Sequence, residues 1–495
     1  MSTTLSRLAA FSLFSLSACT AVAAPWLDPD DPRARYALQK LADRGHLNRS
    51  VTTWPVMWPG IESALNEKNS ADGDEGVTGA LAYLRFTQEY QSGFGARDEF
   101  SVSGTTETPF ATSFGNAASE EGEAQLRMEW IGEGWAARLA PTWTLNPEDD
   151  ETFRPDDSYL AGVAGNWVLG VGTIDRWWGP GWSNSLILSS NGRPIPAVWM
   201  NRRAPSAPST PWLSWLGPWQ LTLFTGLYEN DRTVPNTKLV GMRATFRPLD
   251  GLDIGLSRAI MMGGEGRSES ASTFWDALTG KDNGQQGEGN DPGNQLGSID
   301  VRYGFALGQQ SMSLYAQMMG EDEAGLFPSR KSWLFGTDWT TAIGSSEQQW
   351  FLEYLNTTAD DLLGDGRANV TYEHSVYNSG YRYYGRSMGA SLEGDAEAVV
   401  LGGYNFFANG NNLGASLTYA KLNKDGTSRG TTVDPDVFYN ILAKDQNLAI
   451  ATASYGMPAF YGWLTLNASF TDKEIELLSG EKDQWSLGAQ CQYRF

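Results

Sequence analysis

Apolar and polar residues alternate with a period of two along most of the chain from about residue 79 onward. The alternation is clearest at the end of the chain, where every second position is apolar: Trp485, Leu487, Ala489, Cys491, Tyr493 and Phe495. In a strand, this period puts the two sets on opposite faces. Similar segments occur at 124–130, 135–143, 299–307 and 413–419. A last strand with one apolar face, ending on an aromatic residue, is typical of an outer-membrane barrel.

Short turns alternate with long connections between these segments. The short ones are 132–134, 248–251, 308–309, 409–411 and 457–459, and the long ones are 92–122, 261–296 and 423–445. We predict an all-β transmembrane barrel of about 18 antiparallel strands (the count gives roughly 18 to 20), with short turns periplasmic and long loops extracellular. The weakest strand predictions are near 184–190 and 386–393. A soluble sandwich would alternate in the same way, but the apparent secretory signal and the Phe495 ending favour the barrel.

The first residues are typical of a secretory signal peptide, predicted over 1–23. Arg7 precedes a short apolar core, and Ala21-Val-Ala23 fits the cleavage rule, so the mature chain would begin at Ala24. A lipoprotein box ending at Cys19 is the competing interpretation. An integral barrel does not need an acyl anchor, which favours cleavage without lipidation.

Residues 24–76 differ from the rest and predict a small helical bundle on the periplasmic side. Asp31–Asp43 has Pro32 in its first turn and apolar residues at helical spacing, and Gly45 can end that helix. An extended stretch follows over 53–60, then a short helix over 61–65. The barrel is predicted over 77–495. Its segment 176–218 contains seven prolines, so we expect it to fold over or into the lumen and occlude it.

Composition narrows the class of protein. The formal net charge of −22 argues against a nucleic-acid partner. Aromatic residues make up 12% of the chain, as expected for the girdles of a barrel. The mean hydropathy of −0.36 argues against a helical membrane protein.

An ordered set of motifs resembles the capsule assembly Wzi family. The motifs are Asp175-Arg-Trp-Trp-Gly-Pro-Gly-Trp182, Ser185–Asn191, Arg193-Pro-Ile-Pro196, Gly251–Arg258, Gly293–Leu296, Gly320–Asp322, Tyr372–Tyr377 and Gly380–Arg386, after Leu41–Gly45 and Thr53–Pro55. The resemblance implies an 18-stranded outer-membrane barrel with a periplasmic helical bundle and a blocked lumen. It implies a non-catalytic lectin that holds capsular polysaccharide, or another extracellular matrix polymer, at the cell surface. The expected surroundings are outer-membrane lipid and lipopolysaccharide, the expected state is a monomer, and no cofactor or metal is expected.

Two basic-aromatic clusters are the candidate carbohydrate-binding residues, because aromatic faces stack on sugars and arginine pairs with uronic carboxylates. The first is Arg176, Trp177, Trp178 and Trp182, and the second is Tyr381, Arg382, Tyr384 and Arg386. The second is expected near the periplasmic end or in the lumen. For both clusters the structural alternative, packing and internal ion pairs, is favoured.

Other charged and titratable residues give weaker signals. Residues 320–323 with Arg330 and Lys331 are expected in a solvated extracellular loop, and His46 at a helix end. His374 is placed on the apolar face of a strand, near a membrane interface. Two other functions remain open: a channel for sugars or acidic solutes, and an enzyme, which would have to use His374. The chain has no GxSxG motif, metal-ligand spacing or phosphate loop.

Overall fold

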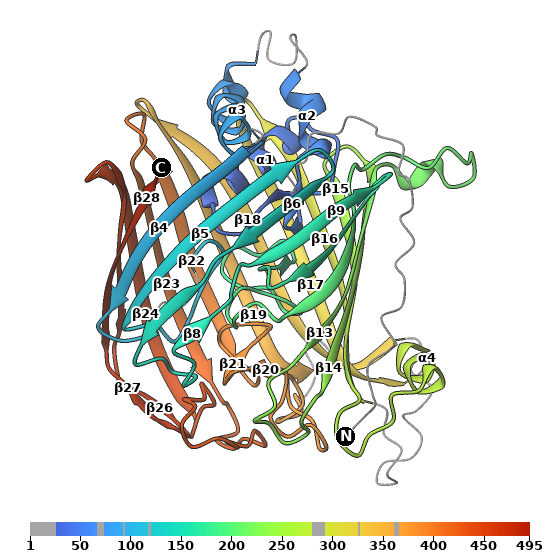
Figure 1. Ribbon diagram of the computed structural model, residues 1–495, viewed down its shortest axis with the longest axis vertical. Coiled ribbons are helices and arrows are strands. Elements are labelled where there is room, and N and C mark those ends of the chain that lie inside the picture. The colour runs from blue at the N-terminus through green and yellow to red at the C-terminus, as the bar shows by residue number, and fades with distance from the viewer. Residues whose placement is uncertain are drawn as a thin grey trace, which may run out of the picture.

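The computed structural model describes residues 26–66, 74–92, 95–116, 120–279, 293–324, 327–360 and 366–495. The predicted signal peptide, its cleavage site and Cys19 lie outside these residues. Over the described residues, the chain forms a closed barrel of 18 antiparallel strands with a helical unit at one end (Figure 1). The predicted fold class is confirmed.

The barrel is built in sequence order, and β28 pairs with β4 to close it. Two of the 18 strands are each divided into two segments: one consists of β6 and β7, and the other of β8 and β9. The barrel strands are β4 (Gly95–Thr105), β5 (Gly122–Gly132), β6 (Trp135–Leu139), β7 (Thr142–Leu145), β8 (Phe153–Arg154), β9 (Tyr159–Ala164), β10 (Trp167–Gly172), β12 (Ala197–Arg202), β13 (Trp219–Leu227), β14 (Lys238–Leu249), β15 (Leu252–Met262), β16 (Gly293–Leu307), β17 (Gln310–Ala324), β18 (Phe327–Ile343), β19 (Ser346–Asp360), β22 (Glu397–Phe406), β23 (Asn412–Leu422), β24 (Gln446–Ala459), β25 (Gly462–Thr471) and β28 (Trp485–Arg494).

The two faces of the wall have opposite chemistry. On β28, Trp485 and Leu487 are exposed on the outer face. On the inner face, Arg243 is fully buried and forms an ion pair with Asp300 at 2.6 Å. Because chain segments fill the lumen, many inward polar residues find partners within the protein, as Arg243 does. The period of two therefore reports a wall with an apolar outside and a polar inside.

The helical unit consists of α1 (Pro32–Asp43), α2 (Pro59–Asn66), the 3₁₀ turn η1 (Glu75–Val77) and α3 (Thr78–Ser92). The Asp31 side chain caps α1 by accepting from the backbone N–H groups of Arg33 and Ala34. The α3 helix was not predicted, since the barrel was expected to begin at residue 77. Val77, Leu81 and Leu84 are buried and stand at helical spacing. Over so short a segment, this spacing is hard to distinguish in the sequence from the period of two of a strand.

Charged contacts seat the helical unit in one end of the barrel. Asp43 of α1 accepts from the guanidinium of Arg302 on β16 at 2.5 and 2.8 Å. Arg247 on β14 donates to the Ala42 carbonyl at 2.7 Å. Arg44 donates to the Gly308 carbonyl in the β16–β17 turn at 2.8 Å. The helices thus occupy the end where the short turns lie, opposite the long loops (Figure 1).

The long segment 176–218 is not one occluding element. Residues 173–196 lie inside the barrel, β12 is a wall strand, and residues 203–218 leave the wall at the helical end. We call residues 173–196 the plug.

Four short strand pairings complete the described structure: β1 (Trp26–Leu27) with β3 (Val56–Met57), β2 (Thr53–Trp54) with β11 (Trp177–Trp178), β20 (Arg382–Tyr383) with β21 (Arg386–Ser387), and β26 (Ile475–Leu477) with β27 (Gly480–Lys482). Two further helical segments are η2 (Ser214–Leu216) and α4 (Ala271–Thr279).

Several local predictions were wrong. Residues 184–190 form no strand, and of 386–393 only the first two residues belong to one, β21. The segment 457–459 belongs to β24, and the turn comes at Phe460 and Tyr461, both with positive φ. The predicted loop 92–122 contains all of β4. Polar and small residues occur in barrel strands as well as in loops, so composition alone misplaced these boundaries.

Candidate functional site

The plug is held by an aromatic core in the lumen. Trp177 and Trp178 form β11 and pair with Trp54 and Thr53 of β2, which belongs to the N-terminal region. Trp177, Trp178 and Trp182 are at most 1% exposed. The Trp182 ring stacks on that of Phe351 on β19, with ring centroids 6.1 Å apart. These indoles join the plug, the N-terminal region and the wall.

Glu353, a buried carboxylate on β19, fastens the plug to the wall. It accepts from the backbone N–H of Trp182 at 2.5 Å and of Ser183 at 2.9 Å, and from the Ser183 hydroxyl. Tyr315 on β17 donates to the same carboxylate at 2.7 Å. Hydrogen bonds to an ionised acceptor in a low-dielectric interior are strong, so this contact fixes the plug's position.

Arg176, the remaining member of the first predicted cluster, is also internal. Its Nη1 donates to the Ile174 carbonyl at 3.0 Å, and its guanidinium lies 4.4 Å from the centroid of the Phe224 ring. Burial lowers the pKa of Arg176 to about 9. The whole first cluster thus packs inside the barrel. A carbohydrate-binding role for these four residues stays a prediction.

The second cluster lies in residues 366–396, which connect the loop ends of β19 and β22. Two positions were expected for this cluster, the lumen and the periplasmic end. The cluster lies in the lumen and not near the helical end. Tyr381 is buried and donates to the Ile187 carbonyl of the plug at 2.9 Å. Arg382 forms ion pairs with Glu393 at 2.9 Å and Glu373 at 3.5 Å. Tyr381 thus ties this segment to the plug, while Arg382 holds the segment together from within.

Tyr384 and Arg386 reach a cavity at the loop end. The cavity has a volume of about 140 Å³ and is lined by Glu120, Glu123, Gln125, Thr142, Glu148, Asp149, Arg154, Asp156, Asp175, Ser190, Asn191, Gly192, Arg193, Pro194, Tyr383, Tyr384 and Arg386. Most of these residues were not predicted as site residues. The Asp175 and Arg193 motifs were recognised only as family signals, and no spacing rule links them to Asp149 or Asp156 in a separate loop.

Ion pairs organise the cavity wall. Arg193 pairs with Asp149 at 2.6 Å and Asp156 at 2.7 Å, and its guanidinium lies 4.7 Å from the Tyr384 ring centroid. Arg154 pairs with Asp149 at 2.5 Å and with Glu120 at 2.7 Å. The arginines of the cavity are therefore held in fixed positions by carboxylates, which preorganises them.

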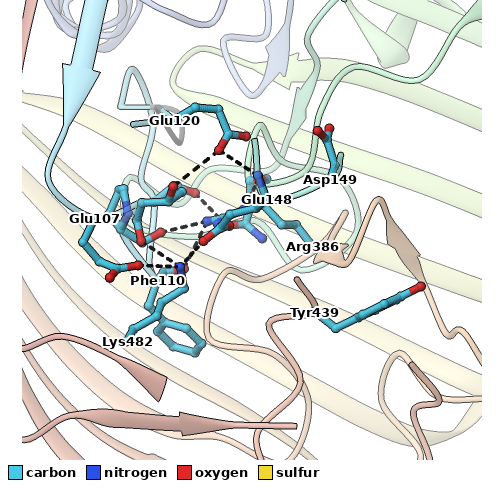
Figure 2. A network of polar contacts seen from close by, with 12 residues as sticks. Glu107, Phe110, Glu120, Glu148, Asp149, Arg386, Tyr439 and Lys482 are labelled. Atoms are coloured by element: carbon cyan, nitrogen blue, oxygen red, sulfur yellow. Dashed lines mark hydrogen bonds and ion pairs between the residues drawn. The ribbon is translucent and has the colours of Figure 1, made fainter. Parts of the chain in front are cut away.

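A second network of charged residues includes Glu148 and Arg386 of the cavity lining. Figure 2 shows Lys482 and Arg386 converging on Glu148, beside Glu107. Arg386 pairs with Glu148 at 3.3 Å, and Lys482 pairs with both Glu148 and Glu107. Burial raises the pKa of Glu148, while Lys482 and Arg386 oppose the rise. The network joins the loop after β4, the loop after β7, the 366–396 segment and the β26–β27 hairpin.

Asp175 gives the cavity a carboxylate that none of the described residues pairs with. It is half-buried. Burial raises the pKa of Asp175 well above its ordinary value, and the neighbouring carboxylates of Asp157 and Asp156 add to the rise. A carboxyl group here can exchange hydrogen bonds with hydroxyl or amine groups of a ligand. Together with the Tyr384 ring, it provides the mixture of aromatic and planar polar groups that sugars require.

The remaining predicted positions have structural contacts. The Nδ1 of His374 accepts from the backbone N–H groups of Val376 and Tyr377 in a loop, so the strand position near a membrane interface was wrong. His46 Nε2 lies 3.1 Å from Asp74, near the end of α1 as predicted. Glu321 is a buried residue of β17, accepting from the Tyr372 N–H at 2.6 Å, and not part of a solvated loop. Arg330 and Lys331 are in β18.

The described residues lack two other kinds of feature. They contain no cluster of three or more His, Cys, Asp or Glu side chains arranged to hold a metal ion. None of the helices in the described part of the chain is both long and apolar enough to cross a membrane.

An apolar outer wall, a polar inner wall and a filled lumen define an integral β-barrel of the outer membrane. The sequence model of the family described as capsule assembly protein Wzi matches residues 95–486. The chain belongs to this family.

Individual relatives agree with this assignment. A Klebsiella pneumoniae protein of 55.8 kDa in the cps region is 34% identical over 339 residues. The match covers 66% of this chain and 64% of the relative, which is less than two thirds of the relative's length. The solved structure of Escherichia coli Wzi, an outer-membrane protein involved in group 1 capsule assembly and described as a carbohydrate-binding β-barrel, is 26% identical, with a TM-score of 0.81 over 95% of this chain and 99% of that one. Pseudomonas aeruginosa OprD is 10% identical over 81% of this chain and 95% of its own, with a TM-score of 0.44, too distant to bear on function.

Proposed function

We propose that this protein is an outer-membrane lectin that attaches capsular or extracellular polysaccharide to the cell surface without catalysis. In this proposal the long loops face the outside and the helical unit faces the periplasm. The observation that carries it is the cavity at the loop end of a barrel whose lumen is filled by its own segments. The carbohydrate binding described for the Escherichia coli relative supports the same function.

The cavity is too small for a polymer, so it would take one or a few sugar units. Tyr384 offers a ring face, and Asp175 and Arg193 offer planar polar groups. A single contact of this kind is weak, but one long chain can engage many barrels in the same membrane. Attachment at many points raises retention far above the affinity of one site, so a monomeric barrel is sufficient.

Binding of the host's own polymer to the purified, detergent-solubilised barrel tests the proposal. We expect Tyr384→Ala to weaken binding about tenfold, since a lost contact worth about 1.4 kcal/mol changes affinity by that factor. The matched control is Tyr461→Ala, which removes a fully exposed tyrosine from the helical end and should bind normally. If the wild-type barrel does not bind the polymer, the lectin proposal fails. If Tyr384→Ala and Asp175→Asn both bind as the wild type does, the polymer is held elsewhere.

A channel for sugars or acidic solutes is the alternative function. It requires an open lumen, whereas the plug, residues 366–396 and α1 occupy this one. Conductance in a planar bilayer separates the two functions: large, stable steps from the wild-type barrel would contradict a blocked lumen.

Gene deletion tests the role in cells. We expect the mutant to release polysaccharide into the medium while continuing to make it, because attachment is lost and synthesis is not. A mutant that makes no polysaccharide would instead place the protein in biosynthesis or export.

A further inference from the structure

An uncharged loop with two exposed tryptophans leaves the barrel wall at the helical end, between β12 and β13. Residues 204–218 read Ala-Pro-Ser-Ala-Pro-Ser-Thr-Pro-Trp-Leu-Ser-Trp-Leu-Gly-Pro, without a charge in a chain that is 19% charged. Trp212 is 72% exposed and Trp215 is 61% exposed. The loop projects sideways from the wall (Figure 1). These indoles therefore take no part in the packing of the lumen.

The tip of this loop satisfies much of its own hydrogen bonding. The backbone N–H groups of Leu213, Leu216 and Gly217 donate to carbonyl groups within the loop, and the Ser214 hydroxyl donates to the Pro211 carbonyl at 2.8 Å. The four prolines of the loop have no N–H to satisfy. In a bilayer, backbone groups without a partner are costly because there is no water to bind them. The tip therefore leaves fewer backbone N–H groups in need of water than a loop without internal hydrogen bonds would.

The loop is continuous with the apolar outside of the barrel. The Trp215 ring packs edge-on against Phe246 of β14, with ring centroids 6.5 Å apart. Phe246 belongs to the outward set of β14, with Met242 and Ala244, as shown by its opposite parity to the buried Arg243. At its base, Arg202 donates to the Trp219 carbonyl at 2.6 Å and to Ser206 Oγ at 2.9 Å. The loop is thus fixed at its root and widens the lipid-facing surface.

We propose that residues 204–218 lie in the boundary between headgroups and acyl chains of the phospholipid leaflet at the helical end, and anchor the barrel there. Indole rings favour this boundary because they are apolar with one polar N–H. The absence of charge fits lipid better than the rim of a protein interface, which is polar. The anchor would fix the depth and tilt of the barrel on one side.

The test uses the full mature chain in nanodiscs of phosphatidylethanolamine and phosphatidylglycerol. Cys491→Ser removes the cysteine of β28, and Trp212→Cys then carries a nitroxide label. The matched control is Asn409→Cys, an exposed residue in a polar turn at the same end of the barrel. We expect the label at 212 to be relaxed more by oxygen, which dissolves in lipid, than by a water-soluble nickel chelate, and the label at 409 to show the reverse. Equal access of the nickel chelate to both labels would overturn the proposal.

A second measurement does not depend on the label. Quenching of tryptophan fluorescence by brominated lipid should fall in the Trp212→Ser, Trp215→Ser double variant relative to the wild type. A shift in electrophoretic migration between the unheated and the heated protein reports whether each variant is folded. Unchanged quenching in a folded double variant contradicts the anchor. A surface used by a protein partner would leave the label at 212 in water in these discs, which hold no other membrane protein, and this result also overturns the proposal.

Discussion

Replacing Glu353 by alanine should unseat the plug. Glu353 lies on the inner face of β19 and is 1% exposed. Its carboxylate accepts hydrogen bonds from the backbone N–H groups of Trp182 and Ser183. Alanine removes the acceptor and leaves no side chain that can replace it. We expect residues 173–196 to separate from the wall at this point and the lumen to open intermittently.

The size of the effect follows from the number of hydrogen bonds lost. Two N–H groups and one hydroxyl of the plug donate to Glu353. A hydrogen bond to a charged group contributes about 1.5–3 kcal/mol. We use the lower figure because the freed donors regain water, so the three bonds together hold the plug by about 4–5 kcal/mol. The ratio of closed to open barrels should fall by about a thousandfold.

Planar-bilayer conductance is the assay. The wild-type barrel should be almost silent, and Glu353→Ala should show frequent openings. Glu397→Ala is the matched control, since it removes a half-exposed carboxylate paired with Lys424 on the wall and such pairs contribute about 0–1 kcal/mol. Silence of a folded Glu353→Ala barrel would refute the reasoning, because the plug would then be held by its indoles alone.

Three further predictions concern stability. Burial raises the pKa of Asp395 to about 7, so ionisation of this carboxyl group opposes the native loop. The stability of residues 366–396 should therefore fall by about 1.4 kcal/mol from pH 6 to pH 8. Hydrogen exchange of these residues should show this loss of stability in the wild type, and Asp395→Asn should abolish it. The effect of burial on Asp74 is outweighed by hydrogen bonds from Arg44 and His46, which lower the pKa of Asp74 below 3.8. The stabilising contact is kept above pH 3.8 and is lost as pH falls through the lowered pKa. Proteolysis of the helical unit should therefore show an acid-dependent step, and Arg44→Ala should remove it. Trp182→Ala should destabilise the plug by about 3–5 kcal/mol, measured by hydrogen exchange of its backbone, and an unchanged rate would contradict its place in the core.

Much of the fold could be predicted because a barrel wall is a repeated local pattern. Each strand alternates on its own, so β16 or β28 is visible without knowledge of its neighbours. The α1 helix was also visible, since Asp31 and Pro32 mark its start within a few residues. In contrast, α3 and the boundaries of β4 were missed, because a short amphipathic helix and a strand of mixed polarity give similar local signals.

The site was less predictable, because it forms from segments that are far apart in the sequence. Tyr384, Arg193 and Asp149 meet only when two loops and the plug fold into the same mouth. The conspicuous Trp177-Trp178 pair attracted attention through its composition, but aromatic residues serve a buried core as well as a sugar. Sequence cannot tell these two uses apart, because burial is a property of the folded chain.

The pairing of β2 with β11 means that the material blocking this lumen is contributed from both ends of the barrel. The β11 strand belongs to the plug, which joins the wall at the loop end. The β2 strand belongs to the N-terminal region around α1, at the helical end. A change at the helical end would therefore affect the loop end, since losing Trp54 removes a pairing partner of β11 in the plug. The blocked lumen and the cavity at the loop end thus depend on the same pairing of two short strands.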